Sequence, residues 1–293
     1  MKVIYREPSN TLERTELWTV QPDRQDQKYL VSITKPLVPV ARPHGMILTD
    51  GNMIVGTAMQ LMTFLEMGAM APSNVIVTIG FPLDNPMPHI VARNRILTPS
   101  VWPEWDESYG RILKLGCPAS GDCDAFRTFI VDELKPAIEA EFGVDRDEWT
   151  LGGHSLGGLF ATHTLLSTPG AFKRYFAVGS SFWWHKPLMF DLAKAFAARR
   201  EPHDIRVYLS AGDKESGDAL KAEWAELMKT PEWQDYIEEM GGFPELVQDT
   251  HEMAAILAGC PGMRVKAETL PNETHGSAVF VALSQGLRWL YTK

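Results

Sequence analysis

A serine between closely spaced glycines is the strongest chemical signal in this 293-residue sequence. Residues 151–159 read Leu-Gly-Gly-His-Ser-Leu-Gly-Gly-Leu and contain the pattern Gly-x-Ser-x-Gly centred on Ser155. In a nucleophile elbow, the serine occupies a strained turn between a strand and a helix, and the flanking glycines avoid clashes. The hydroxyl then lies near a helix N-terminus, which favours developing negative charge. A glycine-rich turn with an incidental serine gives the same pattern, so the neighbouring elements must decide.

A serine hydroxyl becomes a useful nucleophile when a base removes its proton and an anion orients that base. In a protein with such an elbow, the acid and then the histidine follow the serine along the chain. Each of these two partners lies just beyond the carboxyl end of a later strand. His275 follows the last expected strand, residues 263–270, and is the candidate base. Four other histidines follow Ser155 in less suitable places, namely His163, His185, His203 and His251.

The acid is expected after the strand at residues 205–211, where the chain reads Gly-Asp-Lys-Glu over residues 212–215. Asp213 and Glu215 both stand at the correct end of this strand. One of them is expected to be an ordinary charge at a helix N-terminus. The spacing by itself does not choose between them.

An oxyanion hole requires two backbone N–H groups directed at the tetrahedral oxygen. Leu156, the residue after the nucleophile, is expected to supply one of them. Phe81 is the candidate for the other, because Gly80 lets the backbone approach closely and Pro82 has no N–H. The alternative is that residues 80–82 form a plain turn.

Strand and helix patterns alternate along the chain and predict an α/β fold with a doubly wound, mostly parallel sheet. The expected strands cover residues 28–34, 45–48, 74–79, 148–151, 174–178, 205–211 and 263–270. The expected helices cover residues 57–68, 125–142, 156–166, 187–199 and 277–292. Pro136 should kink or split the second of these helices. The serine pattern therefore has a strand before it and a helix after it.

We expect residues 1–293 to form a single domain with two excursions from the alternation. Residues 82–124 are rich in proline and glycine and are expected to be irregular, whereas residues 216–262 are expected to be mostly helical. Long excursions at the carboxyl ends of strands often shape the ligand site, and surface insertions are the alternative.

The composition excludes several classes of protein. The formal net charge of −9 argues against nucleic acid as a partner, because phosphate contacts need clustered Lys and Arg. No apolar stretch approaches the roughly 18 residues of a membrane helix, and the N-terminus lacks a signal-peptide pattern, so we expect a cytoplasmic protein without a membrane partner. The three cysteines have no metal spacing, and no metal or organic cofactor is expected. Free thiols are favoured over a disulfide between Cys117 and Cys123.

The chain resembles the bacterial putative-esterase family of α/β-hydrolases, which includes the enterobactin and salmochelin trilactone esterases. The resemblance extends from about residue 28 to the end. The matching segments are residues 48–52, 79–82, 126–136, 152–160, 180–184 and 274–277. It implies that Ser155 is the nucleophile and His275 the base. It also favours Glu215 over Asp213, because the family's acid follows a glycine by three residues.

The chain departs from the family pattern in two places. Ile96 replaces an acidic residue in the stretch at residues 93–99, and the insertion at residues 216–262 is longer than usual. Both departures lie where substrate contacts would form, so the family's substrate does not transfer directly. Trp183 and Trp184 match a family segment and are candidates to wall the substrate pocket, with packing beneath the site as the alternative.

These residues predict a serine carboxylic-ester hydrolase that works through an acyl-enzyme on a small-molecule ester. A trilactone siderophore esterase is the narrower alternative. An acyltransferase and a catalytically silent binding module on the same fold are further alternatives. The sequence leaves the oligomeric state open.

Overall fold

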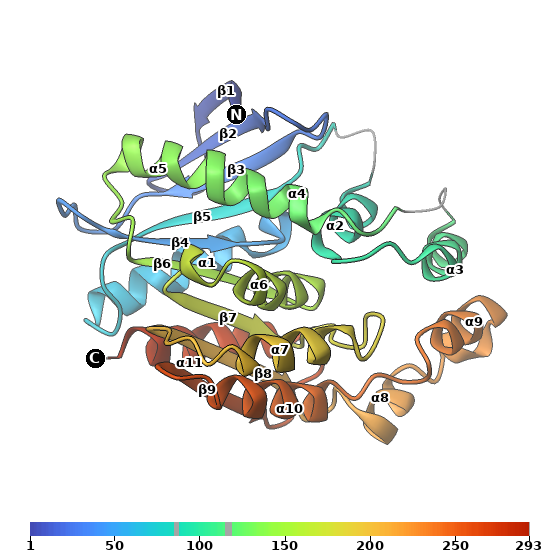
Figure 1. The fold of residues 1–293 in the computed structure, drawn as a ribbon. Helices are drawn as coiled ribbons and strands as arrows, with labels where there is room; N and C mark the ends of the chain where they lie inside the picture. Colours follow the sequence, from blue (N-terminus) through green and yellow to red (C-terminus); the bar gives the residue numbers. More distant parts are fainter. Residues whose placement is uncertain (85–87, 115–118, 293) are drawn as a thin grey trace.

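A nine-stranded sheet forms the centre of the computed structural model, which describes residues 1–84, 88–114 and 119–292 (Figure 1). The strand order is β1-β2-β3-β5-β4-β6-β7-β8-β9. The strands are β1 (Lys2–Pro8), β2 (Thr15–Gln21), β3 (Tyr29–Thr34), β4 (His44–Leu48), β5 (Asn74–Gly80), β6 (Trp149–His154), β7 (Arg174–Val178), β8 (Ile205–Gly212) and β9 (Met263–Leu270).

Helices connect these strands and form the two excursions. The longer helices are α1 (Gly51–Met67), α2 (His89–Leu97), α3 (Pro103–Leu113), α5 (Lys135–Phe142), α6 (Leu156–Ser167), α7 (Leu188–Ala198), α9 (Pro231–Glu239), α10 (Leu246–Ala258) and α11 (Ala278–Tyr291). The short ones are α4 (Cys123–Thr128), the π-helix η1 (Phe129–Leu134), α8 (Gly217–Glu223) and the 3₁₀ turns η2 (Pro169–Ala171) and η3 (Leu227–Lys229).

The direction of the strands places the chemistry at one edge of the sheet. Strands β1, β2, β3 and β5 pair antiparallel to one another in that order. From β5 through β4, β6, β7 and β8 to β9, all neighbours are parallel. Because the carboxyl ends of parallel strands meet at the same edge, the loops that follow β4, β6, β7, β8 and β9 converge there.

Helices cover both faces of the sheet, as Figure 1 shows. Helices α1 and α11 pack on one face and share a buried apolar core that includes Met62 and Leu283. Helices α5, α6, α7 and α10 lie on the other face, over a larger core that includes Phe160 and Phe190. The predicted α/β-hydrolase fold is confirmed, and every expected strand is present.

The prediction was incomplete at the N-terminus and approximate in one helix. Strands β1 and β2 were not anticipated. The helix expected at residues 125–142 is divided into α4, the π-helix η1 and α5, and the last of these begins one residue before Pro136. A break near Pro136 was expected, because proline removes one backbone donor and crowds the preceding turn.

The two excursions differ in how well they were predicted. The prediction of an irregular segment at residues 82–124 was wrong, because α2 and α3 occupy much of its described part. The helical character of residues 216–262 is confirmed. Within that range, α10 packs against β8 and β9 as a crossover helix, whereas α8, η3 and α9 extend beyond the sheet (Figure 1).

Aromatic contacts join the two excursions. Helices α3 and α9 pack together, and the ring centroids of Trp105 and Tyr236 are 5.8 Å apart.

Since all nine strands belong to one sheet, we propose that the chain forms a single domain. In the part of the chain that the structure describes, no helix combines the length and hydropathy needed to cross a membrane. Cys123 and Cys260 are free thiols, and Cys117 lies outside the described residues.

Candidate active site

Ser155 occupies the sharp turn between β6 and α6, at the carboxyl edge of the sheet. Its backbone angles of φ 60° and ψ −121° are strained for a residue with a side chain. The Ser155 N–H donates to the carbonyl of Val178 at 2.8 Å, which fixes the turn against β7. A Cβ atom at Gly153 would lie 2.5 Å from the backbone carbon of Gly157. The two flanking glycines therefore allow the strand and helix to approach, as the sequence pattern predicts.

A chain of hydrogen bonds connects Ser155 to the ends of β8 and β9. The Ser155 hydroxyl lies 3.1 Å from Nε2 of His275, and Nδ1 of His275 lies 2.7 Å from Oε2 of Glu215. Glu215 is fully buried, and its other carboxylate oxygen accepts the Gly212 N–H at 2.7 Å. Asp213, the rival acid, lies beside Lys214 with its nearest oxygen 3.6 Å from Nζ. The structure thus brings Glu215, rather than Asp213, to His275.

Gly179, at the end of β7, makes room for this arrangement. It has a φ of +50°, which favours glycine, and its N–H donates to the Ser210 carbonyl at 2.7 Å. A Cβ atom there would lie 2.6 Å from Oε2 of Glu215 and 3.2 Å from Nδ1 of His275. A larger residue would therefore push the carboxylate and the imidazole apart.

A second histidine lies against the first. The ring centroids of His154 and His275 are 4.4 Å apart. Burial, reinforced by His275 and Arg93, lowers the pKa of His154 well below its usual value, so this ring stays neutral. Its buried Nε2 has no hydrogen-bond partner among the described residues. Sequence reasoning missed this contact, although His154 adjoins the serine in the motif.

The structure does not support Phe81 as an oxyanion donor. Its N–H already donates to Oδ1 of Asn52 at 2.7 Å, and the Asn52 amide donates back to the Phe81 carbonyl at 2.9 Å. Gly80 packs tightly against the same asparagine. Moreover, β4 separates β5 from the nucleophile strand β6. Leu156, by contrast, lies at the first position of α6, directly after Ser155.

The turn after β4 also packs against the elbow. A Cβ atom added to Gly153 would lie 2.5 Å from Oγ1 of Thr49. A Cβ atom added to Gly157 would lie closer still to the same oxygen and 3.2 Å from Oδ2 of Asp50. Asp50 adopts a left-handed conformation with a φ of 57°. Its N–H has no acceptor within the described residues, whereas the Thr49 N–H donates to the Gly152 carbonyl. The Asp50 amide is therefore available beside Ser155.

A buried ion pair between Arg93 on α2 and Asp50 borders the site. Nε of Arg93 donates to Oδ1 of Asp50 at 2.6 Å, and a terminal nitrogen donates to Oδ2 at 3.0 Å. Burial alone would lower the pKa of Arg93, but the carboxylate of Asp50 reverses this effect and raises it. Both side chains are about 10% exposed. In the sequence, Ile96 drew attention to this stretch, and nothing there indicated that Arg93 pairs with Asp50.

A cavity of about 290 Å³ opens beside the serine. Ser155, His275, His154, Asp50 and Arg93 contribute its polar wall. Its apolar wall comes mostly from α1 and α11 and includes Met53, Ile54, Ile90, Phe176, Val279, Phe280 and Leu283. An apolar pocket with a few convergent polar groups is the usual form of a small-molecule site.

Neither predicted tryptophan lines this cavity. Trp184 is fully buried, and its indole N–H donates to the Ser100 hydroxyl at 3.0 Å. Trp183 is half-buried and packs toward Trp105, with ring centroids 6.1 Å apart. Packing against the first excursion, at Trp102 and Trp105, therefore accounts for Trp184. Contact of Trp183 with substrate stays a prediction.

The described residues contain one further group with metal-binding atoms, away from the serine. Cys123, Asp124 and His163 bring their ligand atoms within 4.8 Å of one another. Burial raises the pKa of the Cys123 thiol and disfavours the thiolate that a metal requires. Arg127 also donates a hydrogen bond to the Asp124 carboxylate at 2.8 Å. None of these residues lines the cavity beside Ser155.

The known proteins that this chain resembles include esterases. Residues 100–253 match the family model described as "Putative esterase". The ferri-bacillibactin esterase BesA of Bacillus subtilis is 32% identical over 218 residues, which cover 70% of this chain and 72% of that protein. The siderophore triacetylfusarinine C esterase of Aspergillus fumigatus is 26% identical over 298 residues, covering 96% of this chain and 94% of its own.

A solved structure gives the same picture of the fold. The BES protein from Bacillus cereus superposes with a TM-score of 0.76 at 24% identity, and the alignment covers 98% of each chain. At this identity the likeness concerns the fold alone. It extends over both excursions as well as the sheet.

Proposed function

Because this chain belongs to the Putative esterase family and is an esterase of the serine hydrolase type, we propose that it hydrolyses siderophore esters through Ser155. The observation that carries the proposal is the hydrogen-bonded series from Ser155 through His275 to Glu215. Such a series supplies a nucleophile, a base and an orienting anion in one place.

In the first step, the Ser155 oxygen attacks the ester carbonyl carbon while its proton passes to Nε2 of His275. The 3.1 Å separation of these two atoms suits direct proton transfer. Glu215 holds Nδ1 of His275 in the correct tautomer and stabilises the imidazolium that forms. Its complete burial, with a backbone N–H on the second oxygen, keeps the carboxylate oriented.

Two backbone amides next to the serine are suited to hold the tetrahedral oxygen. We assign one to Leu156, as the sequence predicted. We assign the other to Asp50 in place of Phe81, because the Asp50 N–H is available and its turn packs against the elbow. A donor after the strand beside the nucleophile strand is typical of α/β-hydrolases.

The imidazolium of His275 then protonates the departing alcohol, and the acyl group remains on Ser155. A water molecule, deprotonated by the same histidine, attacks the acyl-enzyme and releases the acid. Both half-reactions use the same residues and require no group beyond this chain and water.

The substrate class is proposed from the relatives, whose names describe esterases of bacillibactin and of triacetylfusarinine C. The cavity of about 290 Å³ is at the small end of the range for ligand sites. It suits one ester unit of a larger molecule. The rest of a trilactone would lie outside this cavity, over the two excursions that we propose shape the substrate site.

A substrate panel with mass detection tests this proposal. The expected result is ring opening of iron-free and iron-loaded trilactone siderophores with a much higher kcat/KM than for p-nitrophenyl acetate. Efficient turnover of the simple ester with none of the trilactone would refute the siderophore assignment while leaving a short-chain esterase. Transfer of the acyl group to an added alcohol in preference to water would indicate an acyltransferase.

A further inference from the structure

A second cavity lies at the amino ends of the parallel strands, on the edge of the sheet opposite Ser155. Its volume is about 1020 Å³. The described residues that line it include two carboxylates, Glu148 and Asp204. They also include five basic side chains, namely Lys173, Arg174, Arg206, Arg264 and Arg288. In a chain with a formal net charge of −9, this local excess of positive charge attracts anions.

Three of the arginines form a row across the sheet. Arg174 on β7 pairs in register with Arg206 on β8, and Arg206 pairs with Arg264 on β9. Side chains at paired positions of neighbouring strands lie on the same face, where like charges repel. Burial and the charges of Arg264 and Arg174 accordingly lower the pKa of Arg206. Asp204 and Glu148 offset part of this repulsion at Arg206, and a further anion would offset more of it.

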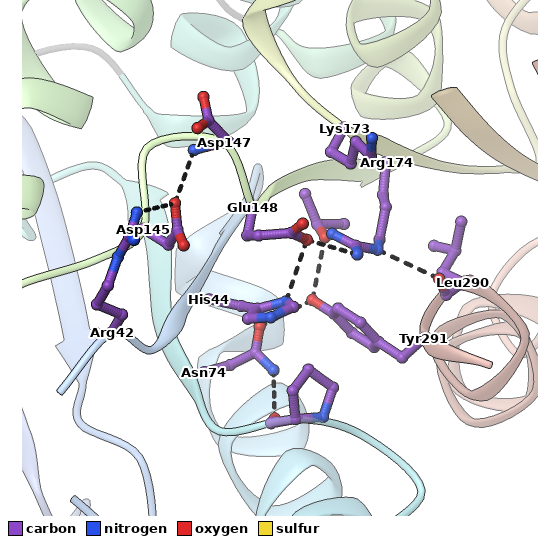
Figure 2. Close-up of polar contacts among 12 residues, drawn as sticks. Arg42, His44, Asn74, Asp145, Asp147, Glu148, Lys173, Arg174, Leu290 and Tyr291 are labelled. Carbon is purple, nitrogen blue, oxygen red and sulfur yellow. Dashed lines mark hydrogen bonds and ion pairs between the residues drawn. The ribbon is translucent and has the colours of Figure 1, made fainter. Parts of the chain in front are cut away.

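Part of this charge is used within the protein, as Figure 2 shows. Glu148, at the start of β6, accepts a hydrogen bond from Arg174 at 2.6 Å. Arg174 and Arg206 also donate to the Leu290 carbonyl at the end of α11, at 3.2 Å and 3.1 Å. Asp204 pairs with Lys173. These contacts explain two arginines as caps of the last helix.

The charges of Arg264 and Arg288 are not explained by contacts of this kind. Within residues 1–84, 88–114 and 119–292, no carboxylate forms an ion pair with Arg206, Arg264 or Arg288. Arg264 and Arg288 are exposed at the cavity, and Nε of Arg288 contacts a carbonyl of its own helix. Glu268 attracts Arg288 but is paired with Lys266 at 2.7 Å. One terminal nitrogen of Arg174 is also buried without a hydrogen-bond partner in the described structure.

We propose that this cavity binds a small polyanion that carries two or more closely spaced phosphate or carboxylate groups. Guanidinium groups recognise such oxygens through paired N–H donors, and several together favour a multiply charged ligand. Arg206, Arg264 and Arg288 would neutralise the ligand. The site lies at the opposite edge of the sheet from Ser155, so it is independent of the proposed esterase function.

Calorimetric titration with pyrophosphate and with citrate tests the proposal. We expect saturable binding of at least one of the two, with the same affinity in the wild type and in Ser155→Ala, and weaker binding as salt is added. Arg264→Gln with Arg288→Gln should weaken binding at least about tenfold. Arg24→Gln is the matched control and should bind like the wild type, because this exposed residue follows β2, lies toward the opposite end of the strand order from β9 and does not line the cavity.

The stronger ligand of the two identifies phosphate or carboxylate as the preferred group. The proposal is overturned if neither anion binds saturably, or if Arg24→Gln weakens binding as much as the double variant. Thermal melting verifies that each variant is folded. If the double variant does not fold, Arg288→Gln by itself should still weaken binding, since this exposed side chain has no ion pair with a described carboxylate.

Discussion

Two carboxylates that are two positions apart in the sequence, Asp213 and Glu215, differ in their distance from His275. Glu215 is fully buried and lies 2.7 Å from Nδ1 of His275, whereas Asp213 is turned toward Lys214. A carboxylate in this position orients the imidazole and stabilises its charged form. The family resemblance suggested Glu215 on a short match, and the geometry now gives a physical reason for it.

Glu215→Gln and Asp213→Asn test this choice as a matched pair. We expect Glu215→Gln to lower kcat by roughly 10²- to 10⁴-fold, because a neutral amide favours the wrong tautomer and does not stabilise the imidazolium. Asp213→Asn should retain kcat within about threefold of the wild type. Steady-state ester hydrolysis measures both. The opposite ranking would assign the acid to Asp213.

At the scale of elements, helix α2 is fastened to the turn before α1 by one buried ion pair. Arg93 contributes two hydrogen bonds to Asp50, whose backbone amide we assign to the oxyanion hole. The pair therefore connects the first excursion to the catalytic turn. Its loss leaves a buried charge without a partner, which costs more than the pair contributes.

We expect Arg93→Gln to reduce the free energy of unfolding by about 3–5 kcal/mol. It should also lower kcat, because the Asp50 turn loses its support. Arg95→Gln on the same helix is the control, since Arg95 is 48% exposed in its pair with Asp122. Its cost should stay below about 1 kcal/mol. Denaturant unfolding compares the two variants, and equal losses would argue against a special role for Arg93.

The elements that the sequence predicted well are those with a strong local pattern. Strand β5 is buried at every residue and reads as one apolar run, whereas β1 is exposed at every residue and gives no such signal. The site was predictable where it follows strand ends, as with Ser155 and His275. Phe81 was a reasonable candidate until the strand order was known. The sequence does not reveal that β4, rather than β5, lies beside β6.

At the scale of the whole molecule, the two edges of one sheet carry opposite kinds of site. The carboxyl edge holds the serine, its partners and an apolar cavity, and the amino edge holds the basic cavity. Partly or fully buried histidines are distributed over the same framework. Burial lowers the pKa of His44, His154, His163 and His185.

These histidines predict a loss of stability in mild acid. Above the unfolded pKa of about 6.5, both states are neutral and the full stability is present. As the pH falls below that value, the unfolded chain binds protons that the folded protein does not. His154, whose pKa lies well below its usual value, then removes up to about 1.4 kcal/mol per pH unit, until its folded pKa is reached.

Denaturant unfolding at about pH 7 and about pH 5.5 measures this effect. The free energy of unfolding should be lower at the acidic pH, and His154→Gln should lose less between the two values than the wild type. An identical loss in the variant would show that His154 does not resist protonation in the folded state.

The central claim is that Ser155 is the activated nucleophile of this esterase. Labelling with a fluorophosphonate, followed by peptide mass mapping, tests it most directly. We predict one phosphonyl adduct, located on Ser155, with labelling strongly slowed in His275→Ala and absent in Ser155→Ala. An adduct on another residue, or ester turnover that survives in Ser155→Ala, would contradict the account.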